Sequence, residues 1–205
     1  MTEQEFKEML AYGREQTGIE FKGPGSRIVN KQLFAKAVRA MLSMANRRNG
    51  GMVIVGIDED VNGRLLPTGL SESDLATWNI YDDLADAVAR YADPYVKFDL
   101  ETLKYDGKAF VVIQVSEFDD IPILCKKDYP DVLREGACYV RTRRKPETAE
   151  VPTQSEMRDL LELATIKALR KYVSVARAAG FEISEATKKS DDQLFKQQLS
   201  DLLEE

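Results

Sequence analysis

Hydrophobic residues recur along the chain with two periodicities, which predict a mixture of helices and strands. Helical spacing of apolar residues predicts helices over residues 2–12, 31–48, 71–91 and 153–179, and a final amphipathic helix over 191–203. Short β-branched or alternating runs predict strands over 18–22, 52–58, 96–103, 109–115 and 137–143, with a short edge at 121–126. This order predicts an α+β (mixed α/β) fold, in which a mixed sheet is flanked by helices.

The 205 residues suffice for one main domain with an appendage. We expect the main domain over residues 1–165 and a helical C-terminal extension over 166–205. A helix of about 13 residues is marginal alone, so the 191–203 helix should dock on the core, on a second copy or on a protein partner. Its apolar stripe consists of Leu194, Phe195, Leu199, Leu202 and Leu203.

The composition narrows the chemistry that is possible. The chain has no apolar run of the roughly 20 residues that span a bilayer, and no apolar leader follows its acidic N-terminus. Its two cysteines, Cys125 and Cys138, make no disulfide framework and are expected as buried or half-buried thiols. Together these features predict a cytoplasmic protein without membrane contact. Because the chain has no histidine, Ser-His-Asp and Cys-His triads, histidine general bases and zinc sites that need imidazole are excluded.

Charge is distributed unevenly along a chain whose net charge is -6. Residues 14–48 carry eight basic and two acidic side chains, and residues 134–145 carry five basic side chains and one acidic side chain. A local basic surface on an acidic protein is typical of a directed polyanion site, although solvated helix faces and a solvated strand edge are the alternatives. Strand alternation would point Arg141 and Arg143 to one face. The candidate nucleic-acid-binding residues are Arg39, Arg47, Arg48, Arg141, Arg143, Arg144 and Lys145.

Acidic residues gather near two predicted strand ends. Glu20 and Lys22 are two apart on one strand and therefore share a face, with Glu15 just upstream. Asp58 ends the 52–58 strand, and Glu59 or Asp60 could take its place. Clustered carboxylates bind Mg²⁺ or Mn²⁺, and a lysine beside them would neutralise charge on a phosphate. Ordinary ion pairs and turn aspartates are the alternative interpretation.

Other features favour structural roles. Gly50-Gly51 fits a helix end that leads into a strand better than a phosphate loop, because no nucleotide-binding motif surrounds it. Trp78 and Tyr81 are expected to pack rather than to stack on bases.

Four segments together resemble the Schlafen-type, Alba-like domain over about residues 10–165: E15-Q-T-G-I-E20-F-K22, A45-N46-R47-R48-N49-G50-G51, V53-I54-V55-G56-I57-D58 and C138-Y-V-R141-T-R143-R144-K145. In nuclease-active members of that family, three acidic residues carry metal-dependent cleavage of structured RNA, particularly tRNA. The resemblance implies Glu15, Glu20 and Asp58 as catalytic, metal-binding acids for Mg²⁺ or Mn²⁺. Lys22 would then be an accessory group that faces phosphate.

The resemblance leaves two functions open. One is a metal-dependent endoribonuclease, fitting stress or phage defence. The other is a non-catalytic DNA- or RNA-binding regulatory module, or a subunit of a larger complex, since many relatives are described only as DNA-binding. The family's two-lobed members also imply a homodimer. Carboxylates that converge in an open groove would favour catalysis, and carboxylates neutralised by arginine would favour binding.

Overall fold

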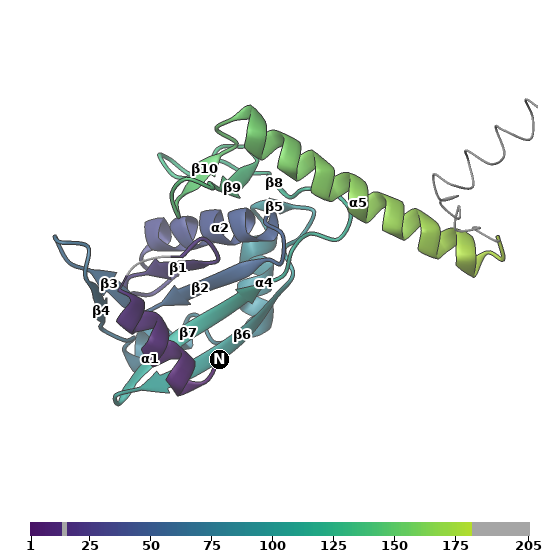
Figure 1. The fold of residues 1–205 in the computed structure, drawn as a ribbon. Coiled ribbons are helices and arrows are strands. Elements are labelled where there is room, and N and C mark those ends of the chain that lie inside the picture. The colour runs from purple at the N-terminus through teal and green to yellow at the C-terminus, as the bar shows by residue number, and fades with distance from the viewer. Residues whose placement is uncertain (14–15, 182–205) are drawn as a thin grey trace, which may run out of the picture. The chain divides into compact units, whose positions relative to one another are not determined.

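A four-stranded mixed sheet with the strand order β1-β2-β7-β6 forms the centre of the fold (Figure 1). The computed structural model describes residues 1–13 and 16–181. β1 (Ile19–Lys22) is parallel to β2 (Gly51–Val55), and β2 is antiparallel to β7 (Lys108–Val115), which is antiparallel to β6 (Phe98–Tyr105). This arrangement confirms the predicted α+β class with a mixed sheet.

Successive strand residues point to opposite sides of a sheet. Consecutive residues of β2 and β7 are apolar, so both faces of the sheet are apolar. Val53, Val55 and Ile113 join the core that includes α2 (Lys31–Ala45). Ile54 and Val112 join a smaller cluster with Phe6 and Met9 of α1 (Glu3–Tyr12). The sheet is therefore sandwiched between α1 on one side and α2 on the other.

Helix α2 is buried around most of its circumference, although its sequence predicts one apolar face. The sheet contacts one side of α2, and the antiparallel pair β9 (Tyr139–Arg141) and β10 (Thr148–Glu150) contacts another. Small side chains such as Ala37 and Ser43 make these close approaches possible. The helix ends at Ala45, three residues before the predicted end, and Asn46 is its C-cap.

The predicted helix over residues 71–91 is in fact two helices, α3 (Glu72–Ala76) and α4 (Tyr81–Ala89). Between them Trp78 is fully buried, and its indole N–H donates to the Gly25 carbonyl at 2.8 Å. Ile80 has an extended backbone before α4 begins. Burial of one large aromatic side chain, which local periodicity does not encode, thus interrupts the helix.

The strand predicted over 52–58 is divided at Gly56, whose φ of 112° suits glycine. Beyond Gly56, β3 (Ile57–Glu59) leaves the main sheet and pairs with β4 (Leu65–Pro67). The predicted edge at 121–126 is reduced to β8 (Leu124–Cys125), which pairs with β5 (Ala92–Asp93). Tertiary pairing, not hydrophobicity, decides where these strands stop.

The chain divides into two compact units, Met1–Ala168 and Leu169–Glu205. Helix α5 (Gln154–Ala178) agrees with the predicted 153–179 helix and runs from the first unit into the second. The predicted 191–203 helix lies outside the described residues. Among the helices that are described, none combines the length and apolar character needed to cross a bilayer.

Candidate nucleic-acid interface

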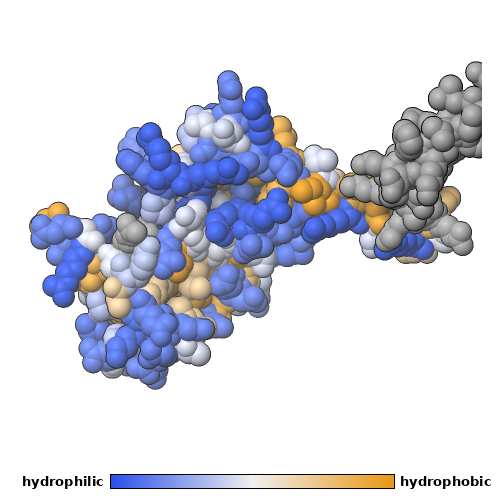
Figure 2. Space-filling model, in the orientation of Figure 1, coloured by the Kyte–Doolittle hydropathy of each residue, from blue (hydrophilic) through white to orange (hydrophobic). Residues whose placement is uncertain are grey.

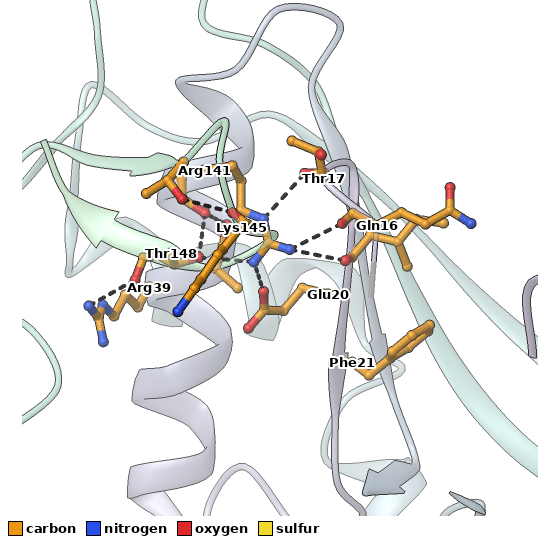
Figure 3. Close-up of polar contacts among 12 residues, drawn as sticks. Gln16, Thr17, Glu20, Phe21, Arg39, Arg141, Lys145 and Thr148 are labelled. Atoms are coloured by element: carbon orange, nitrogen blue, oxygen red, sulfur yellow. Dashed lines mark hydrogen bonds and ion pairs between the residues drawn. The ribbon is translucent and has the colours of Figure 1, made fainter. Parts of the chain in front are cut away.

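Arg141, at the end of β9, is the most deeply buried charged group of the candidate site (Figure 3). Its side chain has no solvent exposure and makes an ion pair with Glu20 of β1. It also donates to the carbonyls of Gln16 and Thr17, at 3.1 and 3.2 Å, and of Ile19 at 3.3 Å. Arg141 therefore fastens the segment before β1 to β9. In this structure the Arg141 side chain is fully buried against the β1 segment, and a phosphate contact by Arg141 stays a prediction.

Glu20 receives two cations. Besides Arg141, the Lys22 ammonium pairs with the other carboxylate oxygen of Glu20. The side chains of Glu20 and Lys22 are only 12% and 14% exposed, which agrees with their predicted position on one face of the strand. The Glu20 carboxylate, for which the family resemblance implies a catalytic role, is thus neutralised by an arginine and a lysine.

Asp58 lies on β3 and is exposed. Its Oδ1 accepts the Glu59 backbone N–H at 3.0 Å, and the same oxygen lies close to Gly23, which directly follows Lys22. Asp60 instead closes the β3–β4 turn, because its Oδ1 accepts the N–H groups of Asn62 and Arg64 at 2.8 and 2.9 Å. Hydrogen bonds from these N–H groups lower the pKa of Asp60, so this residue has a structural role.

The described acids do not form a metal site by themselves. Within residues 1–13 and 16–181, no three acidic, cysteine or histidine side chains are close enough together to hold a metal ion. Glu15, the third predicted acid, lies outside the described residues. A Mg²⁺ or Mn²⁺ site at Glu20 and Asp58 therefore stays a prediction.

Basic residues from distant parts of the sequence line one hollow of about 420 Å³, which we call the arginine hollow. Arg47 and Arg48 reach it from the end of α2, and Arg143 reaches it from the segment after β9. Arg47 is held in place because it donates to the Gly50 carbonyl at 2.7 Å, whereas Arg48 and Arg143 are exposed. The structure thus brings together the two basic segments that the sequence singled out.

Arg144 and Lys145 are exposed on the turn that follows Arg143. Thr142 fixes this turn, because its hydroxyl donates to the Lys145 carbonyl at 2.7 Å. Arg39 does not line the arginine hollow; its guanidinium donates to the Thr148 carbonyl at 3.1 Å and lies over the Tyr139 ring. Of the seven predicted nucleic-acid-binding residues, Arg39 and Arg141 therefore hold β9 and β10 in place.

Three acids of α5, which the sequence analysis left out, line the same hollow: Glu156, Asp159 and Glu162. Asp159 pairs with Arg143 at 2.6 Å, and Glu156 has a buried Oε2 without a hydrogen-bond partner among the described residues. Their spacing of three residues could have shown that they share a helix face. Nothing in the sequence, however, indicated that this face meets Arg143.

Asn46 is a further residue that sequence reasoning missed. Its side chain donates to the carbonyls of Ile123 and Tyr139 at 2.8 and 3.0 Å, and accepts the Ile123 N–H at 2.7 Å. It thereby joins the end of α2 to the segments around β8 and β9. Burial raises the pKa of the neighbouring Cys138 thiol to about 11, which disfavours the thiolate that acts as a nucleophile.

The chain is similar to a known family of proteins over most of its described length. The family model described as "Schlafen, AlbA_2" matches residues 15–150, which include β1, α2, the β3–β4 hairpin and the β9–β10 pair. No curated protein matches.

Two solved structures are similar to this chain. One is the DIP2311 protein from Corynebacterium diphtheriae, at 20% identity and a TM-score of 0.46; the match covers 72% of this chain and 26% of that protein. The other is the N-terminal domain of a putative ATP-dependent DNA helicase RecG-related protein from Nitrosomonas europaea, at 21% identity and a TM-score of 0.48. This match covers 75% of this chain and 98% of that domain. The chain thus matches about a quarter of the Corynebacterium protein.

Proposed function

The chain belongs to the Schlafen AlbA_2 family, and from that premise we propose that it binds structured RNA, tRNA above all, through the arginine hollow. One observation carries this proposal: Arg47, Arg48 and Arg143, from two distant segments, line a single hollow, with exposed Arg144 and Lys145 on the adjoining turn. Guanidinium groups bind phosphate oxygens in bidentate geometry, so such a cluster suits a phosphodiester backbone.

The state of Glu20 supports binding as the leading function. A carboxylate that already pairs with Arg141 and Lys22 is a poorer ligand for a cation than a free one, since a metal would have to displace or share those partners. Phosphate contacts set affinity and its salt dependence rather than sequence preference. The protein is therefore expected to select RNA by its shape.

The test is fluorescence anisotropy with labelled tRNA over a series of salt concentrations. The double variant Arg48→Gln/Arg144→Gln should bind several-fold more weakly, and the slope of log affinity against log salt should fall by about one for each phosphate contact removed. Lys104→Gln/Lys126→Gln removes the same charge from exposed positions that do not line the hollow, and should change affinity less. Equal losses in both variants would reject the arginine hollow as the binding surface, and tighter binding of duplex DNA would reject RNA as the ligand.

The exposed position of Asp58 near the end of β1 favours a second function, the metal-dependent cleavage of RNA. Its carboxylate is exposed and lies beside Gly23, just after the strand that carries Glu20 and Lys22. We propose that Asp58 and Glu20, together with Glu15, would hold Mg²⁺ or Mn²⁺, which polarises phosphate and activates water when bound. Lys22 would then supply positive charge next to the phosphate. A cytoplasmic role in stress or phage defence stays a prediction of the family resemblance.

Asp58→Asn is the sharpest test of cleavage, because the exposed Asp58 side chain can be changed without disturbing a buried ion pair. Wild-type protein should produce tRNA fragments with Mn²⁺ or Mg²⁺ and none with EDTA, and Asp58→Asn should bind tRNA but leave it intact. Glu59→Gln, at the neighbouring exposed position, is the matched control and should cleave normally. Intact tRNA after incubation with wild-type protein and metal would leave binding as the function.

A further inference from the structure

Helix α1 covers only part of the sheet face on which it packs. One cross-strand row, Phe21, Ile54 and Val112, packs against α1. The next row begins with Ile19 and Met52, which line an open groove of about 730 Å³ beside α1. In Figure 2 an apolar patch lies beside α1 over this part of the sheet, with hydrophilic residues around it.

The groove has an apolar floor and an acidic rim. Met9, Met52 and Val112 are among its apolar lining residues, and Glu5, Asp99 and Glu101 are its acids. The N-terminal ammonium of Met1 pairs with Glu101 at 2.9 Å, and the described lining contains no lysine or arginine, so Glu5 and Asp99 keep the rim acidic. Such a surface repels a nucleic acid, so it is unsuited to the ligand proposed above. Methionine side chains adapt to the shape of a bound apolar helix. The groove therefore suits an amphipathic helix that carries basic residues.

The chain itself contains a helical segment of this kind. In the second half of α5, the side chains of Leu169, Tyr172 and Val175 are 60%, 70% and 60% exposed. At 100° per residue these three positions lie on one face of the helix. Arg170, Lys171 and Arg177 flank them, and residues 169–178 contain no acidic side chain. The charge and apolar character of the groove and of this segment are thus complementary.

We propose that two copies of this chain form a dimer in which the 169–178 segment of α5 from each copy lies in the sheet groove of the other. Each copy carries one groove and one such segment, so reciprocal exchange fills both grooves and closes the assembly at two chains. The apolar residues supply the burial, and the acidic rim supplies orientation by attracting Arg170 and Arg177. This contact is separate from the arginine hollow.

Sedimentation equilibrium of the full chain tests the proposal. Wild-type protein should have about twice its monomer mass of 23.1 kDa. A helix variant, Leu169→Gln/Tyr172→Gln, and a groove variant, Met52→Lys, should each raise the dimer dissociation constant about tenfold or more. Ile121→Gln removes an equally exposed apolar side chain elsewhere, since Ile121 is 60% exposed, and should leave the dimer intact.

Mixing the two weakened variants provides the decisive measurement. The helix variant keeps an intact groove and the groove variant keeps an intact helix, so a mixture should form heterodimers through one good contact, more tightly than either variant alone. A pairing of α5 with α5 would instead leave Met52→Lys fully dimeric. A fully dimeric Met52→Lys variant would overturn the proposal. So would a monomeric wild-type protein, including a monomer that binds anionic phosphatidylserine vesicles through Leu169 and Tyr172.

Discussion

Arg141 shows how a single buried side chain can join two distant parts of a chain. Its guanidinium satisfies the carbonyls of Gln16, Thr17 and Ile19 and the carboxylate of Glu20. A buried charge of this kind is tolerated only when its hydrogen bonds and its counter-ion are supplied together. The ion pair with Glu20 is therefore a condition for the docking of β9 beside the β1 segment.

Arg141→Met should lower the free energy of unfolding by about 3 kcal/mol, because it leaves three carbonyls without their buried donor and removes one of the two cations that pair with Glu20. Urea unfolding followed by circular dichroism measures this change. Arg144→Met, at an exposed position of the neighbouring turn, is the control and should change stability by less than about 0.5 kcal/mol. A similar loss in both variants would contradict the assigned role of Arg141.

Cys138 should resist alkylation in the folded protein at neutral pH. Burial raises the pKa of its thiol to about 11 from an ordinary value of 9.0, so very little of the reactive thiolate is present. Iodoacetamide labelling with peptide mass spectrometry should detect slow modification in buffer and rapid modification in denaturant. The raised pKa also means that the thiol contributes to stability below pH 9, and this contribution is lost as the pH rises towards 11. Fast labelling of folded protein at pH 7 would show that Cys138 is accessible.

At the scale of elements, the Gly50-Gly51 connection determines how closely α2 and β2 approach the rest of the sheet. Gly50 has a φ of 65°, and a Cβ at this position would collide with the Val115 carbonyl oxygen of β7. A Cβ at Gly51 would collide with the Met44 sulfur of α2. These glycines are thus required by packing, in agreement with the predicted link between a helix and a strand.

Gly50→Ala should destabilise the protein strongly, by about 3 kcal/mol or more, because backbone and not a flexible side chain fills the space. Gly136→Ala is a matched control: its φ is 77°, but no atom lies within 4 Å of the added methyl group. That variant carries only the strain of a positive φ, about 1 kcal/mol. Thermal unfolding of both variants separates the steric clash from the backbone strain. Equal losses of stability in the two variants would show that the strain of a positive φ alone accounts for the effect of Gly50→Ala.

At the scale of the whole molecule, α5 carries acids into the arginine hollow. Asp159 holds Arg143 at 2.6 Å, and Lys167 of α5 pairs with Glu117 at 2.6 Å. These ion pairs, together with buried Leu160 and Leu163, dock the first half of α5 on the main unit. The α5 acids that line the arginine hollow, Glu156, Asp159 and Glu162, reduce the positive charge that an RNA phosphate would meet there.

Asp159→Asn should therefore strengthen tRNA binding, by about two- to tenfold at low salt, because it frees Arg143 and removes a negative charge from the hollow. Asp119→Asn provides the control, since Asp119 forms an exposed pair with Lys97 and does not line the hollow. Anisotropy titrations of both variants measure the difference. Unchanged or weaker binding by Asp159→Asn would show that Arg143 does not contact RNA.

Elements with local signals could be predicted from the sequence alone. Helical spacing located α1, α2 and α5 to within a few residues, and β-branched runs located β2 and β7, because each of these segments buries an apolar face at its own periodicity. The absence of histidine excludes imidazole chemistry whatever the fold. The spacing of Glu20 and Lys22 also correctly placed their side chains together.

Features that depend on residues far apart in the chain are settled by tertiary packing instead. Trp78 interrupts a helical pattern because its indole reaches Gly25. Arg141 and Arg143 have the same charge and similar sequence surroundings, yet the first is buried against Glu20 and the second is exposed beside Asp159. Burial and ion pairing depend on which segments meet in space, and a single sequence read locally does not contain that information.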